Sequence, residues 1–262
     1  MVISIFTFSV SAKSGGVSVY INNVEYTANM AVKDYTTFVG IRNFSCAMDK
    51  NAVVTYDSGT RTLTVKTPNL TLYATDGSNY IVANGRYLYT ETPVYMQNGV
   101  MYAPVMLMAK SFDAKISWSD ATSSFYITKG SGAILSGDRF YDGDCVYWLS
   151  KIISAESSGE PLMGKIAVGN VILNRVRSKE FPNTIYGVIF DKNYGIQFTP
   201  VANGTIYNTP TEQSIIAAKI CLEGYSINSD ILYFVNPIKS PNSWVSKNEV
   251  FFRQIGNHAF YF

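Results

Sequence analysis

Glu156 is the residue in this sequence whose type and spacing best suit acid chemistry. It occupies the next position on the apolar face of a helix predicted over 144–156, which carries Cys145, Trp148, Leu149, Ile152 and Ile153. A carboxylate at that position is costly to bury unless it lines a cleft or finds a partner. Partial desolvation would raise its pKa and suit it to general acid catalysis. The alternative is a buried structural glutamate paired with an arginine such as Arg175.

Two helices would position this glutamate. Asp144 is the predicted N-cap of the first helix, which should end just after Glu156, where Ser157 to Gly159 loosen the chain. Pro161 suits the first turn of a second helix over 162–178, whose many apolar residues predict burial. We therefore expect Glu156 at the mouth of a core.

Composition limits the classes of protein that remain. The 262 residues are 47% hydrophobic and 15% charged, enough for one large or two ordinary domains. A net charge of +2 gives no case for nucleic acid, and no long apolar run predicts an integral membrane segment. The single histidine, His258, argues against a histidine-rich metal site, so we expect no metal or cofactor. Three distant cysteines imply no disulfide framework and at most one bridge.

The first half of the chain predicts a β-rich duplicated domain over 17–130. The segment 51–67 resembles 112–129 at a constant offset of 62 residues, and 36–48 resembles 99–112 more loosely. Each half predicts a strand or hairpin, a short helix and a hairpin. Before it, residues 1–16 are apolar and predict the remnant of a secretory signal, with an ordinary first strand as the alternative.

The second half predicts a mainly helical domain over 138–262, joined by a Gly/Ser-rich linker at 131–137. A third helix is predicted over 211–224, beginning at Thr211 and Glu212. The segments 231–236 and 250–256 predict a short pair of strands. The fold class is therefore α+β, with a β-rich domain followed by helices and a small β wing.

Two families resemble these halves. The strings NGRYL (84–88) and GVMYAPVMLMAKSFDAKISW (99–118) resemble the copper amine oxidase N-terminal-like domain, a module of secreted bacterial proteins. That segment holds no histidine, so the resemblance implies no copper, and its role would be wall attachment or inert spacing. The string AESSGEPLMGKIAVGNVILNRV (155–176), with IGNHAFY (255–261), resembles the SleB/CwlJ-type cell wall hydrolases of the spore cortex-lytic group.

The second resemblance implies a lysozyme-like domain that cleaves the MurNAc–GlcNAc bond of peptidoglycan. Its catalytic acid corresponds to Glu156, with Glu160 more suited to bracing the turn or capping the next helix. The positions suited to substrate binding are Gln197, Thr199, Tyr233, Asn236 and Trp244, although a loop network or core packing would also explain them. Asn174, Arg175 and His258 are expected to be structural, with His258 a satisfied histidine and Arg175 paired with a carboxylate.

One departure from the family pattern is Ser157-Ser158, which stands where Ala-Arg is usual. The resemblance implies a lytic transglycosylase, secreted and associated with cell wall or spore cortex, whose partner is the peptidoglycan glycan strand. Hydrolysis at the same bond and a non-catalytic wall-binding protein remain as alternatives. The sequence leaves open whether cortex or vegetative wall is the target, and the oligomeric state.

Overall fold

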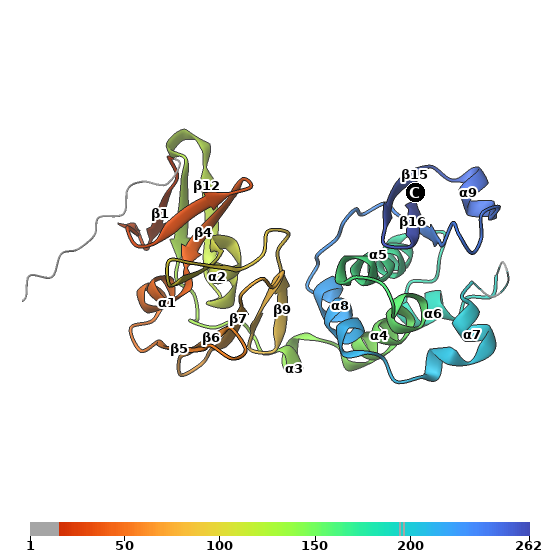
Figure 1. Ribbon diagram of the computed structural model, residues 1–262, viewed down its shortest axis with the longest axis horizontal. Coiled ribbons are helices and arrows are strands. Elements are labelled where there is room, and N and C mark those ends of the chain that lie inside the picture. The colour runs from red at the N-terminus through yellow and green to blue at the C-terminus, as the bar shows by residue number, and fades with distance from the viewer. Residues whose placement is uncertain (1–15, 194, 196) are drawn as a thin grey trace, which may run out of the picture. The chain divides into compact units, whose positions relative to one another are not determined.

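The computed structural model describes residues 16–193, 195 and 197–262, and it divides into two compact units, Met1–Gly137 and Asp138–Phe262. Each unit is described by itself (Figure 1). The predicted signal remnant lies outside the described residues, apart from Gly16. Within the described part of the chain, helices are too short or too polar to cross a membrane. Cys46, Cys145 and Cys221 are all free thiols.

The N-terminal unit is built from two copies of one motif, as predicted. The first copy consists of β3 (Met30–Lys33), β4 (Thr36–Gly40), α1 (Ile41–Met48), β5 (Val53–Asp57) and β6 (Thr62–Lys66). The second consists of β10 (Tyr95–Gln97), β11 (Val100–Pro104), α2 (Val105–Ser111), β12 (Lys115–Ser119) and β13 (Ser124–Thr128), with a 3₁₀ turn at Asp120–Thr122. The hairpins β5–β6 and β12–β13 begin and end at positions that keep the offset seen in the sequence.

The two copies meet in one antiparallel sheet of strand order β10-β11-β4-β3. Tyr102 pairs with Gly40 and Pro104 pairs with Phe38 across the central strands. β4 and β11 begin 64 residues apart, as do α1 and α2, so Phe38 corresponds to Tyr102 and Gly40 to Pro104. The two pairs are therefore equivalent to each other, and Val39 opposite Ala103 lies midway between them. The copies are therefore related by an approximate two-fold axis through that central pair.

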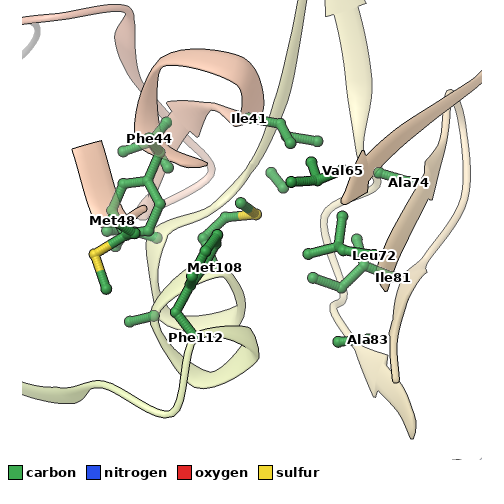
Figure 2. Close-up of a cluster of buried hydrophobic side chains, with 14 of the residues drawn as sticks. Ile41, Phe44, Met48, Val65, Leu72, Ala74, Ile81, Ala83, Met108 and Phe112 are labelled. Atoms are coloured by element: carbon green, nitrogen blue, oxygen red, sulfur yellow. The ribbon is translucent and has the colours of Figure 1, made fainter. Parts of the chain in front are cut away.

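Further strands extend each hairpin and close the core. β1 (Ser18–Ile21) pairs in parallel with β13 and carries β2 (Val24–Glu25), while β7 (Thr71–Thr75), β8 (Tyr80–Ala83) and β9 (Arg86–Tyr89) continue the sheet of β5 and β6. Figure 2 shows how Phe44 of α1 and Phe112 lie on one side of the core, opposite Leu72 and Ile81 of the extended sheet. Burial of such side chains stabilises the fold by about 1.5–3 kcal/mol each.

The Gly/Ser-rich stretch 131–137 packs on the N-terminal unit. The Ile134 amide donates a hydrogen bond to Ser111 O, and the Gly137 amide donates one to Asn84 O. The side chain of Asn84 in turn donates to Ile134 O. The division between the units falls at the start of α3 (Gly137–Phe140).

The C-terminal unit packs three main helices together: α4 (Gly143–Ser157), α5 (Leu162–Arg177) and α8 (Glu212–Leu222) (Figure 1). Gly169 allows the close approach, because a Cβ there would meet Cys221 Sγ at 2.7 Å and Ile153 Cδ1 at 2.9 Å. α8 was predicted to begin at Thr211 and begins at Glu212, with Thr211 as its N-cap. The predicted N-cap of α4 was wrong: Asp142 accepts from the Cys145 amide, and Asp144 lies in the first turn.

Shorter elements surround this core: α6 (Ile185–Ile189), α7 (Thr199–Asn203), a 3₁₀ turn at Thr205–Tyr207, α9 (Trp244–Asn248) and the strands β14 (Tyr233–Val235), β15 (Phe251–Ile255) and β16 (His258–Tyr261). The predicted pairing of 231–236 with 250–256 was wrong. β14 and β15 instead flank β16 in the order β14-β16-β15, so the C-terminal segment forms the central strand.

Candidate active site

Glu156 lies in the last turn of α4, where two hollows in the surface meet. The first hollow, of about 530 Å³, extends towards Gln197 and Asn203, and the second, of about 450 Å³, extends towards Glu160 and Asn257. Glu156, Asn236, Lys239 and His258 line both hollows. The carboxyl group is therefore placed to act on a chain-like ligand that continues on either side of it.

The surroundings of Glu156 favour its protonated form. Burial raises the pKa of this carboxyl from 4.5 to about 7, and the positive charge of Lys239 acts in the opposite direction. Because the pKa lies near neutrality, the group can donate a proton and take one back at physiological pH. Within the described residues Glu156 forms no ion pair with Arg175, so the structural pairing considered above is wrong.

The turn that follows Glu156 is held by a buried lysine. Lys165 of α5 is 1% exposed and donates from Nζ to Ser158 O at 2.9 Å, with a second bond to Glu160 O. Ser157 Oγ donates back to Ile153 O at 2.5 Å. These contacts fix the end of α4 and so fix the backbone that carries Glu156.

Glu160 is tied to the turn between β15 and β16. Its Oε2 accepts from the Asn257 amide at 2.9 Å and its Oε1 from Asn257 Nδ2 at 2.9 Å. Burial acts to raise the pKa of Glu160, but the hydrogen bonds from Asn257 outweigh it and the pKa lies below the ordinary value. Glu160 is thus an ionised brace between α5 and the β wing, and it does not cap α5.

Arg175 lines the first hollow and is enclosed by aromatic rings. Its guanidinium carbon lies 4.8 Å from the ring centre of Phe181 and 5.4 Å from those of Phe198 and Tyr233. Nε donates to Leu232 O at 2.7 Å, and burial lowers the pKa to about 10. The prediction that Arg175 pairs with a carboxylate was wrong, since the described residues contain no such ion pair. Cation–π contacts and a hydrogen bond to one carbonyl hold this side chain instead.

The structure brings together only some of the predicted substrate-binding residues. Gln197, Thr199 and Asn236 line the first hollow. The described linings of both hollows omit Tyr233 and Trp244, whose rings lie 6.2 Å apart, and Trp244 is 62% exposed. Their place in substrate binding stays a prediction.

Asn174 has a structural position, since its Nδ2 donates at 3.0 Å to Asn228 O and to Ile231 O. These bonds fasten α5 to the segment that leads into β14. The side chain thereby supports the strand next to the site without lining either hollow in the described residues.

His258 differs from the satisfied histidine that we expected. It is 7% exposed, its ring centre lies 5.3 Å from that of Phe234, and its Nδ1 is buried without a hydrogen-bond partner in the described structure. Burial lowers its pKa, while Glu160 acts to raise it and Lys239 to lower it further. The imidazole is therefore neutral at pH 7.

Sequence reasoning missed Lys239. It lies in the turn after β14, where Asn236 Oδ1 accepts from the amides of Ile238 and Lys239 at 3.0 and 3.1 Å. The string Asn-Pro-x-x, which favours such a side-chain-capped turn, was the available signal. Nothing in the spacing indicated that the turn would bring an ammonium group beside Glu156.

Comparison with known families accounts for both units. Residues 159–261 match the Cell Wall Hydrolase family, and residues 19–127 match the Copper amine oxidase N-terminal domain. The chain thus carries a cell wall hydrolase domain after a copper amine oxidase N-terminal domain, which confirms both resemblances. The first match begins at Gly159, so Glu156 lies just before it. Copper favours imidazole and thiolate ligands; residues 19–127 contain one cysteine, Cys46, and no histidine.

The curated relatives are spore cortex-lytic enzymes. The enzyme of Bacillus cereus is 38% identical over 121 residues, covering 46% of this chain and 45% of the relative, and that of Bacillus subtilis is 36% identical over 113 residues, covering 43% and 35%. The chain therefore spans less than half the length of the curated relatives it matches.

Among solved structures, the catalytic domain of the germination-specific lytic transglycosylase SleB from Bacillus anthracis is 37% identical to this chain. The match covers 47% of this chain and 97% of that domain, with a TM-score of 0.42. The catalytic domain of the Bacillus cereus SleB protein gives the same identity and TM-score and is covered to 92%.

Proposed function

We propose that the C-terminal unit cleaves the glycan strands of peptidoglycan at the MurNAc–GlcNAc bond, with Glu156 as the catalytic residue. The observation that carries the proposal is a carboxyl group with a pKa of about 7 at the junction of two hollows. A glycan strand lying through both hollows would present one glycosidic bond to this group. The similarity to cell wall hydrolases supports the choice of peptidoglycan as substrate.

Glu156 would act twice in a lytic transglycosylase reaction. As a protonated acid it donates to the glycosidic oxygen, and the bond between that oxygen and C1 of MurNAc breaks. As the resulting carboxylate it takes the proton from the 6-hydroxyl of the same MurNAc, whose oxygen bonds to C1 and closes a 1,6-anhydro ring. Glu156 thereby returns to its protonated form, and a single carboxyl group suffices.

The position of Glu160 supports this one-carboxylate scheme. Glycosidases that use water commonly employ two carboxyl groups, one as acid and one as base or nucleophile. Glu160 is the other glutamate of the second hollow, yet both of its oxygens are occupied by Asn257. It is thus held as a brace rather than left to activate water.

The experiment that tests the proposal is digestion of purified spore cortex and vegetative peptidoglycan with the protein, followed by mass spectrometry of the muropeptides. Anhydro-MurNAc ends are expected. Products with reducing MurNAc ends would instead establish hydrolysis at the same bond. An absence of soluble products from either substrate would contradict cleavage and favour a wall-binding protein.

The proposed setting is outside the cytoplasm, in contact with cell wall or spore cortex. The curated relatives are spore cortex-lytic enzymes, and this supports such a location. The N-terminal unit would then hold the catalytic unit at the wall or act as a spacer. Fluorescently labelled residues 16–137 should be tested for sedimentation with purified sacculi; material that stays in the supernatant would contradict attachment.

A further inference from the structure

His258 is placed at the point where a bound glycan would be cut. It lies at the start of β16, the central strand of the β wing, and lines both hollows together with Glu156 and Asn236. A residue that lines both hollows must be near their junction. His258 therefore stands next to the position proposed for the reacting sugar.

The environment of the ring determines which nitrogen faces the ligand. Nδ1 is buried beside the ring of Phe234 and has no partner among the described residues. Nδ1 lacks a partner in either tautomer, because its proton would have no acceptor and its lone pair has no donor, so burial alone does not choose between the two. Nε2 is not among the buried unpaired atoms of the described residues, so it is the nitrogen that a ligand in the hollows would meet, and an acceptor on the ligand selects the tautomer with the proton on Nε2.

The charged groups around the ring leave it neutral. The charged or ionisable groups that line the hollows with His258 are Glu156, Glu160, Arg175 and Lys239. Since burial lowers the pKa of the imidazole, the carboxylate of Glu160 does not suffice to protonate it at pH 7. The site thus offers an uncharged N–H donor, which suits an uncharged acceptor.

On this basis we infer that His258 binds substrate: its Nε2–H donates a hydrogen bond to the carbonyl oxygen of an acetamido group on the sugar bound beside Glu156. The inference rests on the proposed function. The acetamido carbonyl is the strongest uncharged acceptor that an N-acetylated glycan presents. His258 would thereby make the site selective for N-acetylated over de-N-acetylated sugars.

The first experiment compares wild type and His258→Phe on N-acetylated and chemically de-N-acetylated peptidoglycan. Phenylalanine fills the apolar site and removes the donor. A hydrogen bond of ordinary strength predicts a loss of about threefold to tenfold in kcat/KM on the N-acetylated substrate. On the de-N-acetylated substrate the two proteins should differ by less than about twofold, because the acceptor is absent there.

A second pair of variants tests which nitrogen is used. The amide nitrogen of His258→Gln reaches the place of Nε2, whereas that of His258→Asn reaches the place of Nδ1. We expect the glutamine variant to keep selectivity for the N-acetylated substrate and the asparagine variant to lose it. Circular dichroism of all variants gives the folded fraction, to which each rate is normalised.

The outcomes separate this inference from the proposed function. An equal loss for His258→Phe on both substrates, or rescue by asparagine but not by glutamine, would overturn the role of His258 and leave glycan cleavage standing. Wild-type protein that releases nothing from either substrate would overturn the proposed function itself, and the inference with it.

Discussion

Glu156 is expected to be indispensable for glycan cleavage, because in the proposed scheme it carries both proton transfers. We predict that Glu156→Gln lowers the rate of muropeptide release by about 10²–10⁴-fold or more, the range typical of general acid–base catalysis. Its melting temperature should hold or rise, since the change removes an ionisable group from a partly buried position.

Glu160→Gln is the matched control for that prediction. It removes the charge that accepts two hydrogen bonds from Asn257, so the melting temperature should fall, with activity following the folded fraction. A folded but inactive Glu160→Gln, beside a Glu156→Gln within tenfold of wild type, would reverse the assignment of the acid.

The raised pKa of Glu156 sets the pH dependence of the reaction. The acid form is required for the first step, so the rate should fall as the pH rises through about 7. The same carboxyl group makes stability depend on pH. Between about pH 4.5 and pH 7, Glu156 is protonated in the folded state and ionised in the unfolded state, so the free energy of unfolding falls as the pH rises. The stability gain of Glu156→Gln should therefore grow across this window, as measured by urea unfolding at several pH values.

Lys239 should lower the pKa of Glu156 from its position in the lining of both hollows. Its positive charge acts to lower the pKa of Glu156, so Lys239→Met should move the alkaline limb of the rate profile to higher pH. The side chain is exposed and solvent screens its charge, so we expect a shift of less than about one pH unit. The control is Lys247→Met. Lys247 is an exposed lysine of α9 that is absent from the described linings of both hollows, so its replacement should leave the pH profile unchanged. Equal shifts of the profile in both variants would contradict a specific effect of Lys239.

Among single residues, the position of Glu156 at a hollow could be predicted from the sequence because an apolar helical stripe ends on it, and its role as the acid stays a prediction. The partners of Arg175 could not be predicted, since rings from Phe181, Phe198 and Tyr233 meet only after folding. Lys239 was missed for a similar reason, because an exposed lysine in a turn has no pattern of its own.

Among the elements, the turn between β15 and β16 depends on a single glycine. Gly256 has a φ of +58°, and a Cβ there would collide with the Glu160 carboxylate and lie 3.1 Å from Pro161 Cδ. We predict that Gly256→Ala destabilises the protein by more than the roughly 1–2 kcal/mol of left-handed strain alone, as measured by chemical denaturation.

Gly224→Ala is the control that measures backbone strain without a steric clash. Gly224 also has a positive φ, of +94°, but a Cβ there would meet open space. Its cost should be the smaller of the two. Equal losses of stability in the two alanine variants would mean that contact with Glu160 adds nothing at Gly256.

The helices at 144–156, 162–178 and 211–224 were predicted to within two residues of their observed ends, because apolar spacing and capping residues are local features. The β wing was predicted less well. β16 is buried at all four positions, so it lacks the alternation that marks a strand with one exposed face. Which strands become neighbours depends on packing against α5, and no local pattern contains that information.

For the whole molecule, we predict that the two units separate under limited proteolysis with trypsin. Arg139 is exposed in α3, a four-residue helix next to the division between Gly137 and Asp138. Cleavage after Arg139 should leave two fragments that keep their circular dichroism spectra, and the fragment from residue 140 onward should retain muropeptide release. Loss of structure in either fragment would contradict the division into independent domains.

The approximate two-fold axis through Val39 and Ala103 means that the N-terminal unit has the geometry of a homodimer whose subunits were joined into one polypeptide. The contact between β4 and β11 is isologous: the same strand edge is used by both partners. As separate molecules, two such halves would associate in proportion to their concentration, and each would expose an unpaired β-edge until they met. Fusion makes the encounter intramolecular, so this edge is covered in every copy of the protein, however dilute the protein becomes.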